Sequence, residues 1–509
     1  MRHEGLPCTH GHPQSRGADA TPLAPLTGEP LPPVRQSTAD DVALAYARAR
    51  AAQSGWAALP ARERARPVRR FASLLLRRQD EILDLVQRET GKARLHAHEE
   101  VLDAALVSTY YARRAPRLLR PRRRAGALPL LTYAVEVRHP LGVVGVITPW
   151  NYPLALAVTD IVPALLAGNA VVHKPDTQTA RTAAWARDLM AEAGLPDGVW
   201  QQVTGEPADI GDALLDGADH LCLTGSTAAG RAVAMGAGRR LIGCSLELGG
   251  KNSLLVRADA DLDQAAQAAV RACFASAGQL CLSAERIIVH ERVHEAFLER
   301  FLPLVRGLRL AGGLDYGPQM GSLSLPRVLA TVRRHLEDAT ARGAVVLAGG
   351  AARPDLGPLF HEPTVLGGVT PDMAVYREET FGPVVAVFAV PGDDAAVELA
   401  NDTEYGLNAA VFSRDTGAAR ALARRLRAGT VNINEGYAAA YASHDAPMGG
   451  MKSSGLGRRH GTAGLLAYTA PQTIAHQRLN LTPPAGPGQA RYARALTAAV
   501  RAMQLLHLR

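Results

Sequence analysis

The chain has 509 residues, of which 47% are apolar and 20% are charged. These fractions are close to those of average soluble globular proteins and exclude a disordered chain, which would bury too little apolar surface to fold. The 48 glycines follow no triplet period, which excludes a collagen-like chain. We find no run of about 18 apolar residues, so we expect no transmembrane helix.

The net charge of +8 comes from 56 basic and 48 acidic residues. Of the basic residues, 52 are Arg and 4 are Lys, and this bias runs through the whole sequence. One dense basic run comprises Arg113, Arg114, Arg117, Arg120, Arg122, Arg123 and Arg124. Such a run is usually a solvated face or a subunit contact, and no nucleic-acid-binding module accompanies it. We therefore expect no nucleic-acid partner.

The five cysteines do not form the pattern of a disulfide framework, because they are few, odd in number and widely spaced. The N-terminus has no apolar segment of the kind found in secretory signals. The sequence thus predicts a cytoplasmic protein.

The first 36 residues are rich in Pro, Gly and Thr, and we predict a mobile tail over 1–36. Side chains that could bind a metal occur there, but we expect no metal site because nothing rigid would fix its geometry; they are His3, Cys8, His10 and His12. Residues 37–118 have apolar residues at helical spacing, and Thr38 and Asp40 suit the start of the first helix.

From residue 132 to residue 256, short apolar runs alternate with helical stretches, as in 141–148 and 169–174. A second series of this kind covers 257–450, and a Gly-rich loop and a tail cover 451–509. Such alternation predicts an α/β fold with parallel sheets that are covered by helices on both faces.

A glycine-rich segment lies at Thr224–Arg231, where a strand ends and a helix begins. Backbone N–H groups at a helix N-terminus favour a phosphate. The spacing differs from both the dinucleotide fingerprint and the phosphate loop, so an ordinary strand-to-helix turn is the alternative.

Three further residues suit covalent chemistry. Cys281 lies in a loop after a glycine, where a thiol can be partly exposed, although a buried structural cysteine is the alternative. Glu247 ends an apolar strand, where partial desolvation favours a general base, or where backbone donors could satisfy it. Asn151 follows a buried strand and could donate to an oxyanion or cap the next helix.

These segments occur in an order that resembles the aldehyde dehydrogenase superfamily over roughly residues 37–480. The resemblance is carried by PWNYP, HKPDTQT, TGSTAAG, LELGGKN, GQLCLSAER, EETFGPV, NDTEYGLNAAVF and PMGGMKSSGLGRRHG. Within the superfamily, the NADP-dependent succinate-semialdehyde dehydrogenases are the most similar group.

The resemblance implies two Rossmann-like domains with parallel sheets and a β oligomerisation arm. The cofactor-binding domain would comprise 37–131 and 141–256, and the catalytic domain 257–465. The arm would comprise 132–140 and 466–482. A C-terminal tail would follow over 483–509, with an amphipathic helix that packs on a partner subunit rather than on a membrane. A homodimer or homotetramer is expected.

The resemblance also implies roles for the three reactive residues. Cys281 would attack an aldehyde to give a thiohemiacetal and then a thioester, Asn151 would hold the oxyanion, and Glu247 would activate water. Because relatives that transfer the acyl group to coenzyme A commonly lack this acid, a free carboxylic acid is the expected product. No metal is expected.

Cofactor residues are implied in the same way. Lys174 and Thr177 would bind the adenosine ribose. Thr177 stands where many relatives have Glu, and this favours NADP because no carboxylate would repel the 2′-phosphate. NAD is the alternative cofactor. The remaining cofactor-binding residues would be Trp150, Gly225, Ser226, Gly230, Glu379 and Phe381.

The substrate region departs from the family pattern. Asp160 stands where a basic residue is common, and its carboxylate would repel an anionic substrate. Arg459 stands where Glu is usual. Arg286, Tyr437 and Ser443 are the candidate substrate-binding residues. Succinate semialdehyde is the favoured substrate; an uncharged medium-chain or aromatic aldehyde and a non-catalytic cofactor-binding protein are the alternatives.

Overall fold

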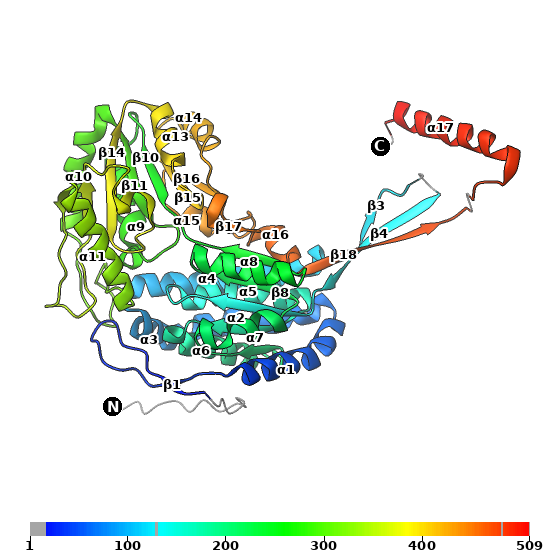
Figure 1. Cartoon of the computed structure of the whole chain (residues 1–509), viewed down its shortest axis with the longest axis horizontal. Helices are drawn as coiled ribbons and strands as arrows, with labels where there is room; N and C mark the ends of the chain where they lie inside the picture. Colours follow the sequence, from blue (N-terminus) through cyan, green and yellow to red (C-terminus); the bar gives the residue numbers. More distant parts are fainter. Residues whose placement is uncertain (1–16, 128–130, 480–481, 508–509) are drawn as a thin grey trace. The chain divides into compact units, whose positions relative to one another are not determined.

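A computed structural model describes residues 17–127, 131–479 and 482–507 of the chain (Figure 1). The chain forms two compact units. The larger unit comprises Met1–Pro116 and Pro140–Tyr468, and the smaller comprises Arg117–His139 and Thr469–Arg509. Within the described ranges, no helix has the length and apolar character needed to cross a membrane. The histidines and the cysteine of the first twelve residues lie outside the described ranges.

The first sheet of the larger unit has six strands in the order β17-β9-β8-β5-β6-β7. Its strands are β5 (Val143–Thr148), β6 (Ala170–Pro175), β7 (Trp200–Gln202), β8 (His220–Thr224), β9 (Gly243–Glu247) and β17 (Gly455–Leu456). All pairs are parallel except that of β17 with β9. Every residue of β6 and β8 is buried, as expected for parallel strands covered on both faces.

The helices of this part come mainly from the first half of the chain. They are α1 (Ala39–Ala58), α2 (Ala61–Arg77), α3 (Gln79–Thr90), α4 (Arg94–Leu118), α5 (Pro153–Ala167), η1 (Thr177–Thr179), α6 (Ala180–Glu192), α7 (Pro207–Gly217) and α8 (Thr227–Arg239). Thr38 caps α1 in a capping box with Asp41, which confirms the predicted helix start. Helix α5 is buried on all sides, in keeping with its continuous apolar sequence.

The second sheet of the larger unit has seven strands in the order β12-β13-β14-β11-β10-β15-β16. They are β10 (Asn252–Val256), β11 (Ala284–His290), β12 (Val345–Ala348), β13 (Thr364–Gly367), β14 (Val384–Val390), β15 (Asn408–Phe412) and β16 (Thr430–Ile433). The edge strand β12 is antiparallel to β13, and the other pairs are parallel.

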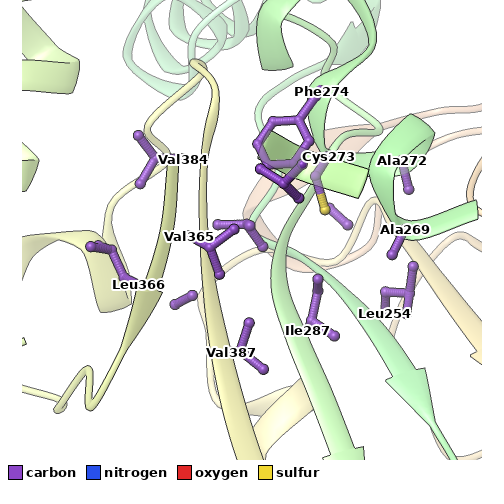
Figure 2. Close-up of a cluster of buried hydrophobic side chains, with 14 of the residues drawn as sticks. Leu254, Ala269, Ala272, Cys273, Phe274, Ile287, Val365, Leu366, Val384 and Val387 are labelled. Atoms are coloured by element: carbon purple, nitrogen blue, oxygen red, sulfur yellow. The ribbon is translucent and has the colours of Figure 1, made fainter. Parts of the chain in front are cut away.

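The helices around this sheet are α9 (Leu262–Phe274), η2 (Ala275–Gly278), η3 (Glu291–Val293), α10 (His294–Arg306), α11 (Pro326–Ala341), α12 (Ala374–Arg377), α13 (Asp393–Asn401), α14 (Thr416–Ala423), α15 (Ala438–Tyr441), η4 (Lys452–Ser454) and α16 (Gly461–Leu466). Figure 2 shows part of the apolar core of this sheet, which includes Phe274, Ile287 and Val387. Cys273 belongs to this core and is 2% exposed, so it is a structural cysteine.

The observed sheets correct two predicted domain boundaries. Strand β10 was expected to close the first α/β domain at residue 256, but it pairs with β11 and β15 in the second sheet. Strand β17 was expected in the second domain, but it pairs with β9 in the first sheet. The Gly249–Gly250 turn between β9 and β10 lets the chain pass between sheets, which the apolar pattern alone does not reveal.

The predicted mobile tail is wrong for residues 17–36. Strands β1 (Asp19–Ala20) and β2 (Val34–Arg35) pair with each other. Gln178 fixes the connection, since its side-chain amide donates to Leu23 O at 2.7 Å. Backbone and amide hydrogen bonds order this segment, so the absence of an apolar period gave no sign of it.

The smaller unit contains a three-stranded antiparallel sheet in the order β18-β4-β3, with β3 (Arg122–Arg124), β4 (Thr132–Pro140) and β18 (Thr469–Gln477). Strand β3 is part of the basic run that we interpreted as a solvated face or subunit contact. Its Arg124 donates to Glu136 of β4, which stabilises an arginine-rich strand against its low strand propensity. After η5 (Gly486–Gly488), helix α17 (Gln489–Leu505) has no buried residue.

Candidate active site

Cys281 follows a segment with an unusual backbone. Ser276, Ala277 and Gly278 all have positive φ, at 50°, 56° and 74°. For the two residues with a Cβ, this conformation costs about 1–3 kcal/mol each, so the surroundings must hold it in place. The Ser276 N–H donates to His96 Nδ1 at 3.2 Å, and its hydroxyl bonds to Tyr152 at 2.8 Å. The loop thereby places Cys281 in a partly exposed position, as the sequence predicts.

Cys281 lines a cavity of about 190 Å³ that lies within the larger unit, and we call it the main cavity. Much of its wall is apolar, including Leu102, Leu106 and Met448. Its polar lining residues are Glu99, Glu100, Asp103, Asn151, Tyr152, Arg271, Cys281, Tyr437, Tyr441, His444 and Arg459. The geometry therefore brings a thiol and a side-chain amide to one cavity.

Asn151 is 4% exposed and lies between β5 and α5. Its Nδ2 donates to Gln279 O at 2.9 Å, which aligns the amide with the loop that carries Cys281. An amide nitrogen has two hydrogens, so the second remains for an oxygen that forms next to the thiol.

A buried ion pair that the sequence analysis missed supports Asn151 from behind. Lys92 Nζ lies 2.5 Å from Glu100 Oε1 and donates to Asn151 O at 2.6 Å. Glu100 Oε2 accepts from the N–H groups of Leu154 and Ala155 at 2.9 and 3.2 Å, in the first turn of α5. Lys92 is one of four lysines in an arginine-rich chain, and this rarity is the signal that could have found it.

Burial dominates the acid–base properties of Cys281 and Glu247. It raises the pKa of the Cys281 thiol to about 12, an effect that Arg459 opposes and that Glu247 and Glu379 strengthen. It also raises the pKa of Glu247 to about 7, again opposed by Arg459. The thiol therefore needs a base to ionise at neutral pH, and Glu247 titrates in the range where a base is useful.

Glu247 ends β9 and lines a second cavity of about 10 Å³, which we call the small cavity. Asp160, Cys222 and Arg459 line it as well. Arg459 lines both cavities and so connects the surroundings of Cys281 with those of Glu247.

Several of the predicted cofactor residues lie where the strands of the first sheet end. Lys174 is next to the last residue of β6, and Gly225 and Ser226 join β8 to α8. Ser226 caps α8 by accepting from Ala229 N at 3.2 Å. A Cβ at Gly230 would lie 2.6 Å from the terminal methyl groups of Leu248, so a larger residue there would force that side chain to move. A helix N-terminus with close backbone at the carboxyl ends of parallel strands suits a dinucleotide pyrophosphate.

Thr177 begins η1 directly after β6, and its hydroxyl donates to Gln36 Oε1 at 3.2 Å. Burial lowers the pKa of Lys174, while Asp176 and Glu206 oppose that shift. The ordered N-terminal segment thus reaches the residues expected to bind the adenosine ribose.

The remaining predicted cofactor residues come together from both sheets. Glu379 accepts from Gly250 N at 2.8 Å, and burial raises its pKa to about 8. The rings of Trp150 and Phe381 meet edge to face with centroids 5.7 Å apart. Phe381 has φ of 52°, and its N–H donates to Glu285 at 2.9 Å.

Two of the three predicted substrate residues do not line the main cavity. Arg286 is 1% exposed and donates to backbone carbonyls of Lys251, Leu399, Ala400 and Asp402, so its guanidinium is a structural bridge. Ser443 is exposed and donates to Ala439 O, which caps the end of a short helix. Tyr437 does line the main cavity, but its hydroxyl donates to Glu99 at 3.3 Å.

The charge of Asp160 is paired in the structure, whereas the sequence suggested an isolated carboxylate that would repel an anion. It is 3% exposed, and its Oδ2 accepts from Arg459 Nη2 at 2.7 Å. The two departures from the family pattern thus form one buried ion pair, between residues far apart in the sequence.

The chain is similar to known proteins over most of its length. The family model described as aldehyde dehydrogenase family matches residues 13–474. A putative succinate-semialdehyde dehydrogenase (NADP+) from Mycolicibacterium smegmatis is 52% identical over 94% of this chain and 93% of its own. The mitochondrial succinate-semialdehyde dehydrogenase of rice, Oryza sativa subsp. japonica, is 36% identical over 90% of this chain and 86% of its own.

Solved structures have the same fold. An NADP-dependent enzyme from E. coli gives a TM-score of 0.87 at 34% identity and covers 90% of this chain and 95% of its own. Betaine aldehyde dehydrogenase from Staphylococcus aureus in complex with NAD+ gives a TM-score of 0.86 at 32% identity and covers 91% of this chain and 92% of its own. The chain therefore belongs to the aldehyde dehydrogenase family, which confirms the predicted fold class and enzyme class, an NAD(P)-dependent aldehyde dehydrogenase.

Proposed function

We propose that the protein oxidises succinate semialdehyde to succinate with NADP, through a covalent intermediate on Cys281. The observation that carries this proposal is that Cys281 and Asn151 line one cavity, and that Arg459 lines both this cavity and the one that Glu247 lines. The names of the two succinate-semialdehyde dehydrogenases similar to this chain support the choice of substrate.

In the proposed mechanism, the Cys281 thiol loses its proton to a base, and its sulfur attacks the aldehyde carbon. The oxygen of the resulting thiohemiacetal accepts from the free Asn151 N–H and the Cys281 backbone N–H. Loss of a hydride from that carbon leaves a thioester on Cys281. Glu247 then takes a proton from the water that attacks the thioester, which releases the acid and restores the thiol.

Lys174 and Thr177 would hold the adenosine ribose with its 2′-phosphate, and Gly225, Ser226 and Gly230 the pyrophosphate. The nicotinamide end would lie against Trp150, Glu379 and Phe381. NADP bound there would accept the hydride. Thr177 supports NADP because it brings no negative charge to the 2′-phosphate. NAD is the alternative cofactor, since the betaine aldehyde dehydrogenase similar to this chain was solved in complex with NAD+.

An uncharged medium-chain or aromatic aldehyde is the second candidate substrate. The apolar wall formed by Leu102, Leu106 and Met448 favours it. A non-catalytic role has no such support, because all three reactive residues are present at the site.

The test is kcat/KM for succinate semialdehyde and for pentanal, an uncharged aldehyde of similar size, with NADP. A preference of at least about 100-fold for the anion, about 2.7 kcal/mol, supports the proposed substrate. Equal or better use of pentanal contradicts it. Cys281→Ala should abolish oxidation of both aldehydes, whereas Cys273→Ala, a matched change in the apolar core, should keep it.

A further inference from the structure

Arg459 is a rigidly held cation that faces both cavities. Its side chain is 4% exposed. Its backbone N–H donates to Met448 O at 2.8 Å, and its carbonyl accepts from Met448 N at 2.9 Å. Arg459 lines the main cavity together with Cys281, so its side chain borders the space where the substrate would lie.

The guanidinium has unused donor capacity. Nη2 donates to Asp160 Oδ2 and to Thr224 Oγ1, both at 2.7 Å. The buried Nε, in contrast, has no hydrogen-bond partner among the described residues. A buried N–H of a charged group that lacks an acceptor is costly, and a carboxylate oxygen is the acceptor that best suits a guanidinium.

Other polar groups of the main cavity are already committed. Tyr441 donates its hydroxyl hydrogen to Asp103 at 2.9 Å, and Tyr437 donates to Glu99 at 3.3 Å. A hydroxyl has one hydrogen, so neither can also donate to a substrate. Arg271 is about half exposed and pairs with Glu99 at 2.9 Å, so its charge is offset and screened by solvent.

Asp160 contacts Arg459 and lines only one of the two cavities. It lines the small cavity with Glu247 but is not among the lining residues of the main cavity. Its carboxylate therefore holds the guanidinium in place instead of meeting the substrate.

We propose that Arg459 is the specificity-determining residue that binds the carboxylate of the substrate, with Asp160 as its positioning residue. This inference rests on the proposed function, because it needs a substrate with an anionic end. It assigns the recognition of that end to the loop that follows β17, where the ion pair supplies a fixed donor.

The test uses the ratio of kcat/KM for succinate semialdehyde to that for pentanal. Arg459→Met should lower this ratio about 10- to 100-fold, the range expected for a lost charged hydrogen bond. Arg459→Lys should recover only part of the ratio, because an ammonium lacks the fork geometry of a guanidinium. Arg271→Met is the matched control, which removes a cation from the same cavity and should leave the ratio within about threefold.

Because Arg459→Met leaves Asp160 buried and unpaired, a second variant is needed. Asp160→Asn combined with Arg459→Met removes both charges and should fold while showing the same loss of the ratio. Calorimetry gives a readout without turnover: in the Cys281→Ala background, succinate should bind about 10- to 100-fold more weakly when Arg459 is Met.

The outcomes separate the two proposals. A wild-type enzyme without preference for the anion contradicts the proposed function. A wild-type preference that survives in the double variant, or that is lost in Arg271→Met instead, overturns the role of Arg459 and leaves the proposed function standing. If Arg459→Met lowers kcat/KM for both aldehydes by the same factor, the proposed role of Arg459 is also overturned. The residue would then serve the chemistry or the fold and not the recognition of the carboxylate.

Discussion

The carboxyl group of Glu247 is desolvated, and this burial raises its pKa to about 7. A general base acts only when deprotonated, so the proposed hydrolysis should speed up as pH rises through 7. We expect kcat to increase about tenfold between pH 6 and pH 8, where the deprotonated fraction grows from about a tenth to nine tenths. Steady-state rates with NADP over this range measure it.

Glu247→Gln keeps the shape of the side chain and removes the base. This variant should release about one NADPH per active site in a rapid burst and then stop, because the thioester would not hydrolyse. Intact-protein mass spectrometry should find the acyl group on Cys281. Sustained turnover in Glu247→Gln, with the same rise of kcat through pH 7, would rule out this role.

At the level of single residues, the sequence indicates where a residue lies in its element but not which partners it meets. Cys281 and Asn151 were predicted from their places at the ends of elements, and both line the main cavity, while their proposed roles stay predictions. Arg286 was misassigned because its sequence neighbourhood does not reveal that its side chain meets four backbone carbonyls. The Asp160–Arg459 pair could not be found at all, since its two charges come from α5 and from a loop near the C-terminus.

At the level of elements, helix α5 depends on the Lys92–Glu100 pair, which is 2% and 0% exposed. Lys92→Met would leave the Glu100 charge buried without its partner, at a cost of about 3–5 kcal/mol in the free energy of unfolding. We expect a clear fall in Tm together with reduced kcat, because Lys92 also holds the carbonyl of Asn151.

Removal of both charges gives the control. Lys92→Met combined with Glu100→Leu should be more stable than Lys92→Met alone, because no unpaired charge remains buried. Thermal unfolding followed by circular dichroism compares the variants. If Lys92→Met unfolds at the wild-type temperature, the pair does not stabilise α5.

The turn between β6 and α6 is the element where cofactor choice is expected to lie. Thr177→Glu would put a carboxylate next to the site proposed for the 2′-phosphate, and it would also displace the hydrogen bond to Gln36. The ratio of kcat/KM with NADP to that with NAD should fall at least about tenfold, since the carboxylate repels the phosphate and accepts from a free ribose hydroxyl.

Thr177→Val separates the two effects, because it removes the hydroxyl without adding charge. We expect the same ratio to stay within about twofold, because the single hydroxyl hydrogen of Thr177 is already donated to Gln36 and not to the cofactor. An unchanged ratio in Thr177→Glu would place cofactor choice elsewhere.

Element prediction succeeded where burial imposes a pattern and failed where hydrogen bonds alone impose order. The buried strands β5, β6 and β8 stand out as apolar runs between helices. Strands β1 and β2 each have only two residues, and β3 consists of three arginines instead of an apolar run. Such elements are fixed by their partners, which a single sequence does not name.

At the scale of the whole molecule, the candidate site residues are divided between the two sheets of the larger unit. Asn151, Lys174 and Glu247 lie at or just beyond the carboxyl ends of β5, β6 and β9 in the first sheet. Cys281 and Glu379 precede β11 and β14 of the second sheet. Because the chain passes directly from β9 to β10 through two glycines, Glu247 is fixed at the point where it leaves one sheet for the other.

The smaller unit bears on assembly. Strand β18 exposes almost all of its length, including Ile474 at 53%, and Leu479 just beyond it is 54% exposed. Apolar side chains on an open sheet are typical of surfaces that another chain covers. The predicted homodimer or homotetramer should therefore weaken when a charge is placed on this strand, because burying it in an interface costs several kcal/mol.

Ile474→Asp tests this, with Thr473→Asp as the matched control on the neighbouring position, whose side chain points to the opposite face of the strand. We expect light scattering to show an assembled wild type and control, and a shift of Ile474→Asp to the monomer mass at micromolar concentration. If Ile474→Asp keeps the wild-type mass while Thr473→Asp dissociates, the opposite face forms the contact. If the wild type itself is monomeric, the expected assembly through this strand is wrong, and the exposed side chains of β18 need another explanation.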